Sequence, residues 1–149
     1  MYKHILVPTD GSKLSLKAAK EAAKLAKKIK AKITALYVIE PFMPPSTGET
    51  ALLMRQSGVQ EKYAKTMKEH AGEAPAKVAA TAAAAKVSCD TLSVINFHPW
   101  DGIIKAARSK KCDLIVMASH GRRGLASLIL GSETHKVLTH SKTPVLVCR

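Results

Sequence analysis

The stretch HILVPTDGS, residues 4–12, decides the fold. A continuously apolar run ends there in a short polar turn, and a helix is predicted directly after it, over residues 12–30. In that helix apolar side chains recur every three or four positions, and lysines recur in the same way on the opposite side. A buried strand that leads at once into an amphipathic helix is the first half of a strand–helix–strand unit.

The same alternation continues to the end of the chain. Four more apolar runs are predicted strands, at residues 32–39 (KITALYVI), 91–97 (TLSVINF), 114–118 (LIVMA) and 145–148 (VLVC). The remaining helices are predicted as two pieces within residues 48–87, over 101–111 and over 132–140. Because such strands are typical of covered sheets, we predict an α/β fold with a single doubly wound five-stranded parallel sheet and helices on both faces. One domain is expected, spanning residues 1–149.

The long connection before the third strand contains two residues that disfavour a continuous helix. Gly72 has a low helix propensity, and Pro75 lacks the N–H group that a helix interior uses. We therefore predict a kink or break near Ala74.

Composition is typical of a globular protein in a reducing compartment. The chain has 149 residues, of which 46% are hydrophobic and 23% charged, so it can bury a core without disulfides or metals. Its three cysteines, Cys89, Cys112 and Cys148, are far apart and form no Cys-x-x-Cys pair. No apolar run approaches the ~20 residues of a membrane-spanning helix, and the first strand begins too early to leave room for a signal peptide. We expect a cytoplasmic protein with no membrane segment.

A formal net charge of +13 invites a nucleic-acid interpretation. Much of this charge lies in the first predicted helix, where Lys13, Lys17, Lys20, Lys24 and Lys27 share one face. A solvated lysine face opposite an apolar stripe accounts for the pattern, and no aromatic residues interleave with the lysines to stack on bases. Nucleic-acid binding is therefore the weaker interpretation, and it predicts a steep salt dependence that needs none of the glycine-rich loops.

The turn after the first strand is a candidate ligand site. If the chain starts in the middle of the sheet, the winding direction reverses between the first and fourth strands, and ligands bind at such a reversal. The first strand is followed by Thr9, Asp10, Gly11 and Ser12. Asp10 is placed to hold a divalent ion or a ribose and phosphate network, but Asp10 or Ser12 can equally cap the first helix. Spacing alone does not separate these roles.

Two glycine clusters follow the fourth strand. The segment SHGRRG occupies residues 119–124, and Gly131-Ser132 opens the last predicted helix. Glycine lets backbone N–H groups approach an anion closely, and a helix N-terminus adds free N–H groups and the positive end of a dipole. Turn glycines with a serine cap are the alternative, but two clusters framing a fixed spacer favour a phosphate cradle.

These motifs resemble the universal stress protein family along the whole chain. The likeness lies in Val-Pro-x-Asp-Gly-Ser, Met-x-Ser-His-Gly-Arg-Arg-Gly, Leu-Gly-Ser and the final Pro-Val-Leu-Val. Members of that family that bind ATP carry Gly, two residues, Gly, nine residues and Gly-Ser. Gly121 and Gly131-Ser132 match this pattern, and Ala118 stands at its first glycine. The resemblance implies an adenine nucleotide alpha hydrolase-like fold.

The resemblance also implies a set of ATP-binding residues. Pro8, Thr9 and Asp10 would line the ribose and phosphate side, Val38 and Met117 the adenine, and His120, Gly121, Gly131, Ser132, Glu133 and Thr134 the phosphates. Asp10 would also hold Mg²⁺ that arrives with the ATP. At Ala118 the extra methyl group has little effect if the residue keeps negative φ, but costs about 1 kcal/mol or more if positive φ is required.

The sequence offers binding groups without a clear catalytic base. It contains neither a Gly-x-x-x-x-Gly-Lys-Ser/Thr loop nor a Gly-x-Ser-x-Gly elbow, so we expect at most slow ATP hydrolysis. The resemblance implies a stress-responsive ATP-binding regulator. The alternative, favoured by Ala118, is a family member without nucleotide binding that acts through protein contacts. The apolar last strand predicts a sheet edge that pairs with its own copy to form a homodimer.

Overall fold

The computed structural model has five parallel strands in one sheet, and it describes residues 1–121 and 130–149. The strands are β1 His4–Pro8, β2 Lys32–Ile39, β3 Cys89–Ile95, β4 Leu114–Ala118 and β5 Val145–Cys148. Their order in the sheet is β3-β2-β1-β4-β5. The chain therefore starts in the middle of the sheet, and the predicted doubly wound α/β fold is confirmed. The spacer between the two glycine clusters, at residues 122–129, lies outside the described residues.

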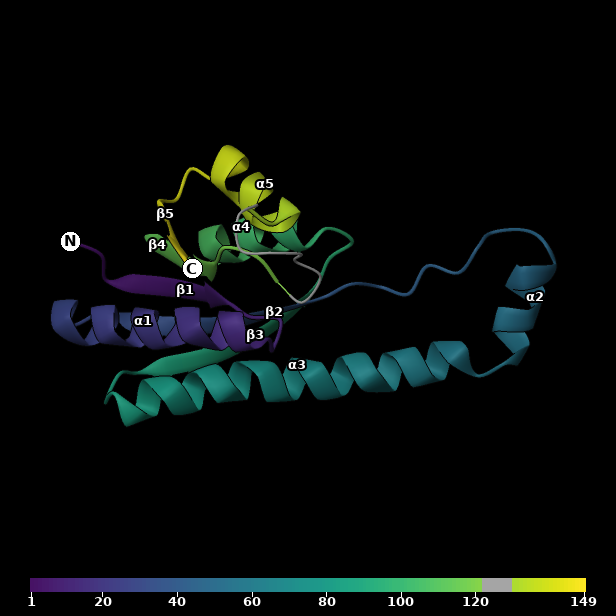
Figure 1. Ribbon diagram of the computed structural model, residues 1–149, viewed down its shortest axis with the longest axis horizontal. Helices are drawn as coiled ribbons and strands as arrows, with labels where there is room; N and C mark the ends of the chain where they lie inside the picture. The colour runs from purple at the N-terminus through teal and green to yellow at the C-terminus, as the bar shows by residue number, and fades with distance from the viewer. Residues whose placement is uncertain (122–129) are drawn as a thin grey trace.

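Helices cover both faces of this sheet (Figure 1). The helices are α1 Lys13–Ile29, α2 Glu49–Gln56, α3 Val59–Ala84, α4 Pro99–Ser109 and α5 Ser132–His140, and all but α2 pack on the sheet. The pairs α1/α3 and α4/α5 pack on opposite faces. The third strand begins two residues earlier than predicted, and α4 begins at Pro99 rather than residue 101, because a proline is well suited to the first turn of a helix.

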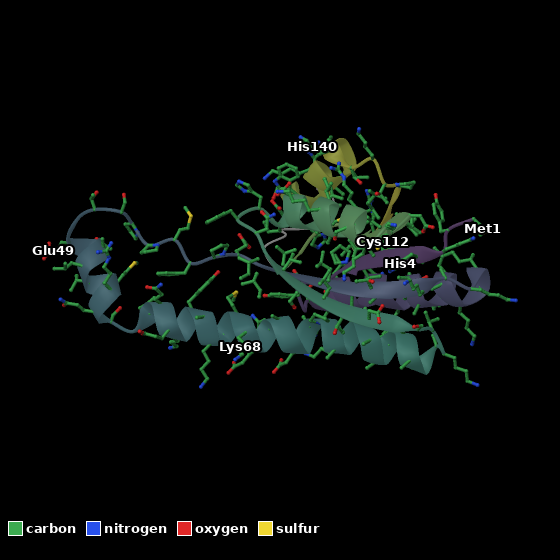
Figure 2. The ribbon with its side chains drawn as sticks, turned by 180° about the vertical axis from the view of Figure 1, so that it is seen from behind. Met1, His4, Glu49, Lys68, Cys112 and His140 are labelled. Atoms are coloured by element: carbon green, nitrogen blue, oxygen red, sulfur yellow. The ribbon has the colours of Figure 1, made fainter. Side chains whose placement is uncertain are left out.

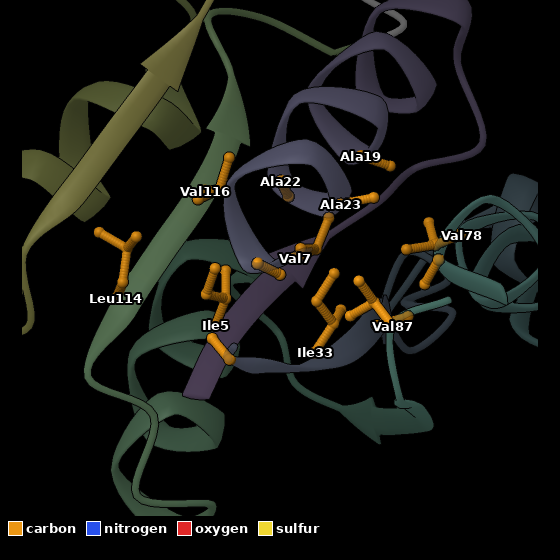
Figure 3. Close-up of a cluster of buried hydrophobic side chains, with 14 residues drawn as sticks. Ile5, Val7, Ala19, Ala22, Ala23, Ile33, Val78, Val87, Leu114 and Val116 are labelled. Atoms are coloured by element: carbon orange, nitrogen blue, oxygen red, sulfur yellow. The ribbon is translucent and has the colours of Figure 1, made fainter. Parts of the chain in front are cut away.

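The larger core cluster lies between the sheet and the α1/α3 pair (Figure 3). Ile5, Val7 and Ile33 project from the strands and are completely buried, and they meet the alanine stripe of α1. Alanine side chains let α1 pack close to the strands, so branched aliphatic residues fill this core without aromatic rings. The close packing fixes where α1 begins, and with it the turn after β1.

The predicted break near Ala74 is wrong. Helix α3 is unbroken from Val59 to Ala84 and contains Pro75, while the interruption in this connection falls earlier, at Gly58, where φ is +67°. Proline cannot donate a hydrogen bond to the carbonyl oxygen of Ala71, four residues before it. The Ser93 hydroxyl of β3 donates to that oxygen instead, at 3.0 Å. A contact from the sheet therefore satisfies the acceptor that the proline leaves open.

The first half of α3 and the whole of α2 extend beyond the sheet as an arm (Figure 1). Its base is held by a ring contact between Phe42 and Tyr63, whose centroids are 5.2 Å apart, and by the Tyr63 hydroxyl, which donates to the Glu40 carbonyl at 2.7 Å. Among the described residues, no helix is both long and apolar enough to cross a membrane.

Candidate functional site

The two loops predicted to form the site meet at the middle of the sheet. Strands β1 and β4 are direct neighbours, with Ile5 opposite Leu114 and Leu6 opposite Ile115. The turn after β1 and the loop after β4 consequently leave the same edge of the sheet side by side. This is the point at which the winding direction reverses, as the sequence predicted.

The turn after β1 is held by its own polar side chains. Asp10 accepts the Ser12 N–H through Oδ1 at 3.0 Å, and the Thr9 hydroxyl accepts the Gly11 N–H at 3.1 Å. The Ser12 hydroxyl caps α1 by accepting the Ser15 N–H at 3.1 Å. Of the two roles left open for Asp10, helix capping thus belongs to Ser12. Asp10 closes the turn just before the helix.

Asp10 lies directly against Gly121. A Cβ atom built on Gly121 would be 2.6 Å from the second carboxylate oxygen of Asp10, Oδ2. The backbone of Gly121 does not have positive φ, so the need for glycine here is one of space. Gly121 and the Asp10 carboxylate therefore lie against each other at the reversal point.

Gly131 closes the opposite side of the cradle. Its N–H donates to the Ser119 carbonyl at 2.8 Å, and a Cβ atom on Gly131 would lie 3.0 Å from the Cα of His120. Gly131 is the N-terminal cap of α5 and has φ −60°, so a side chain here would crowd His120 rather than strain the backbone. The start of α5 is thereby brought against the loop after β4, with the positive end of its dipole toward that loop.

Ala118 fits its position without backbone strain. It pairs with Cys148 inside β4, and it is not among the non-glycine residues of the described chain that have positive φ. Its carbonyl oxygen accepts the buried Thr134 hydroxyl of α5 at 3.0 Å. The methyl group that replaces the family's glycine accordingly occupies an ordinary strand position. The Thr134 hydrogen bond therefore connects α5 to β4.

The Glu133 side chain is held at α4. Its Oε2 accepts the Trp100 N–H at 2.9 Å, and its Oε1 lies 3.3 Å from the Lys136 ammonium group. The N-cap residue of α4, His98, makes no side-chain capping bond, so the α5 carboxylate caps α4 in its place. This role was missed at the sequence level, because a bond between residues 33 apart has no local signal.

The two apolar residues assigned to the adenine differ in accessibility. Met117 is only 6% exposed and belongs to the core under α4 and α5. Val38 is half-buried at the end of β2, and a Cβ atom on Gly102 of α4 would meet its Cγ1 at 3.0 Å. Of the two, Val38 therefore has more exposed surface, and it lies near the carboxyl end of β2. Gly102, which the sequence did not single out, lets α4 pack against it.

The remaining predicted residues lie at the ends of β1 and β4 and at the start of α5. Pro8 ends β1 opposite Leu36, His120 is half-buried with its Nδ1 3.2 Å from the Ser119 hydroxyl, and Ser132 is exposed at the first position of α5. Within the described parts of the chain, no group of three or more His, Cys, Asp or Glu side chains is arranged to hold a metal. A cation at Asp10 would therefore need oxygen ligands from a bound phosphate.

These features define a class of protein, the doubly wound parallel α/β folds whose glycine-built loops lie where the strand order reverses. The universal stress protein family model matches residues 1–149, and the chain belongs to that family.

Relatives of this family align over the full chain. The universal stress protein MJ0531 of Methanocaldococcus jannaschii is 37% identical over 149 residues, which cover 100% of this chain and 83% of the relative. The solved structure of MJ0577 from the same organism has a TM-score of 0.77 and 26% identity, covering 99% of this chain and 95% of that one. A universal stress protein in complex with cAMP has a TM-score of 0.63 and 24% identity, covering 99% and 97%.

Proposed function

We propose that the protein binds an adenine nucleotide, namely ATP together with Mg²⁺, in the cradle between β1, β4 and α5. The observation that carries this proposal is the pair of glycines with no room for a side chain, Gly121 against Asp10 and Gly131 against His120. Neither glycine has positive φ. What the two share is that the backbone at each position lies close to a neighbouring residue. Such loops at a helix N-terminus favour an anion.

The residues present fit this ligand. In this proposal, backbone N–H groups of the first turn of α5 bind the phosphates, Asp10 supplies a carboxylate for a phosphate-bound cation, and Val38 supplies apolar surface for the base. The Glu133 carboxylate accepts the Trp100 N–H of α4, so the negative charge of its side chain is directed at α4. The backbone N–H of Glu133 can still donate to a phosphate. A protein of the same fold is a complex with cAMP, which supports the ligand class and not the individual residues.

The proposed role is regulation during stress, with nucleotide occupancy as the signal. In this proposal Asp10 and His120 contact the ligand, and the 3.2 Å contact between His120 Nδ1 and the Ser119 hydroxyl is assigned no catalytic role. Oriented water alone would give slow hydrolysis at most. We therefore place the protein among binding proteins, with any ATP turnover incidental to occupancy.

The family's pairing through the last strand is proposed here as well. β5 is an outer strand of the sheet, and its Leu146 side chain is 43% exposed. An open edge with an exposed apolar side chain can pair with the same edge of a second copy about a two-fold axis. Substitution of Leu146 by arginine should weaken such an association, measured by sedimentation.

The nucleotide proposal is tested by amide chemical shifts. Mg-ATP added to nucleotide-free, ¹⁵N-labelled protein should shift the amides of Asp10, Gly121 and Gly131 with one saturating curve. GTP should shift them at higher concentration, and the Gly131→Val variant should lose the effect. The Ala80→Val variant, changed at an exposed position of α3, is the matched control and should behave as the unmodified protein. A folded protein with no saturable shifts would favour the alternative, a family member that works through protein contacts.

A further inference from the structure

One exposed face of α3 has no function in the fold described above. It is a shallow hollow lined by Lys65, Lys68, Glu69, Gly72, Glu73 and Ala76, all of them exposed. Figure 2 shows Lys68 on the side of α3 that is turned away from the sheet. The face therefore lies on the outside of the α1/α3 layer, on the opposite side of that layer from the core.

The charges of this face are not used within the described part of the chain. The ion pairs there join Lys24 to Glu21, Lys105 to Asp101 and Lys136 to Glu133. Lys65 and Glu69 have the four-residue spacing that allows a pair on a helix, yet no ion pair joins them. Two cations followed by two anions along one helix face thus remain open to an outside partner.

Gly72 is one of the residues that line the hollow. Glycine in a helix interior lowers helix stability relative to alanine, and here a Cβ atom would meet nothing within 4 Å. Its φ lies outside the positive range, so neither backbone conformation nor internal packing requires glycine. What glycine does allow is close approach of another chain segment to the helix backbone.

We propose that this face binds α3 of a second copy of the chain in antiparallel orientation. Setting Lys68 opposite Glu69 of the second copy places Lys65 across the second copy's Gly72, one residue from its Glu73. The two-fold axis repeats each contact, so every cation of the face meets an anion. A parallel arrangement in register would set like charges opposite each other, so the charge order selects the antiparallel second copy as occupant.

This interface is separate from the proposed β5 edge. Helix α3 packs on β2 and β3, whereas β5 is the outer strand at the opposite end of the sheet. One copy can accordingly use both surfaces at once. The α3 inference goes beyond nucleotide binding and does not depend on it.

Complementary charge reversal provides a sharp test, read as mass by light scattering at micromolar concentration and low salt. Lys65→Glu alone and Glu73→Lys alone should each lower the mass of the assembly at least twofold, because both symmetric contacts between identical variants then join like charges. Mixing the two variants should restore the full mass. In the mixed pair the two introduced charges oppose each other at one contact, and the native Lys65 and Glu73 oppose each other at the other. A chain that carries both substitutions should also assemble with itself.

Two controls keep the outcome readable. The substituted side chains are exposed, so circular dichroism should show an unchanged fold for every variant. Leu146→Arg tests the β5 edge and should leave the complementation between Lys65→Glu and Glu73→Lys intact. The α3 interface is overturned if both single variants keep the mass of the unmodified protein, if that protein is monomeric, or if mixing fails to restore association.

Discussion

The Ser93 hydroxyl donates to the carbonyl oxygen of Ala71 at 3.0 Å and so connects the outer strand β3 to the middle of α3. Ala71 lies four residues before Pro75, and its carbonyl has no helical donor because proline has no N–H group. This contact explains how a 26-residue helix continues through a proline. It also makes the stability of α3 depend on the sheet.

Replacing Ser93 by alanine should lower the free energy of unfolding by about 0.5–1 kcal/mol, the usual range for one exposed hydrogen bond. The loss should shrink in a Pro75→Ala background, because the alanine introduced there would supply the missing N–H to the Ala71 carbonyl. Urea unfolding of the four proteins of this double-mutant cycle measures the coupling. Equal losses in both backgrounds would show that Ser93 does not compensate for the proline.

Replacing Ala118 by glycine should change nucleotide affinity by less than about threefold, since the strand backbone at this position is already unstrained. The same change should lower stability by about 0.5–1 kcal/mol, because glycine loses more conformational freedom on folding. Calorimetric titration and urea unfolding give the two values. A gain in affinity of about tenfold or more would mean that the methyl group obstructs the ligand.

Replacing Glu133 by alanine should cost about 1 kcal/mol of stability through loss of the α4 cap, whereas Glu133→Gln should retain most of it. Neither change should weaken Mg-ATP binding, because the carboxylate is bonded to Trp100 rather than to the ligand. Urea unfolding and calorimetry of both variants check this. Loss of ATP affinity in Glu133→Gln with stability intact would place the carboxylate in the nucleotide site instead.

His4 makes stability depend on pH. Burial, followed by the positive charge of Lys32, lowers the pKa of His4 below its ordinary value of 6.5, and its Nε2 is 2.8 Å from the Thr34 hydroxyl. The unfolded chain then binds this proton more readily, so the free energy of unfolding should fall as pH drops below about 6.5. His4→Gln should lose less stability between pH 7 and pH 5. Identical pH profiles for both proteins would contradict this assignment.

The sequence predicted the fold and the meeting of the loops after β1 and β4, because both depend on local patterns and a topological rule. The apolar runs marked all five strands, and the reversal rule places Asp10 near Gly121, as the structure shows. The bonds from Ser93 to Ala71 and from Glu133 to Trp100 join segments 22 and 33 residues apart. Such contacts follow from tertiary packing, which is why the proline was misinterpreted and the cap was missed.

Calorimetric titration of Mg-ATP into nucleotide-free protein tests the central claim most directly, with Gly121→Ala, Asp10→Ala and the control Ala80→Val alongside. We predict micromolar binding to the unmodified protein and to the control. We predict at least a tenfold loss of Mg-ATP affinity, about 1.4 kcal/mol, in the other two variants. A Cβ atom on residue 121 would lie 2.6 Å from Oδ2 of Asp10 and would displace that carboxylate. Absence of binding to the folded unmodified protein, or equal affinity in all four proteins, would contradict a nucleotide cradle at this point of the sheet.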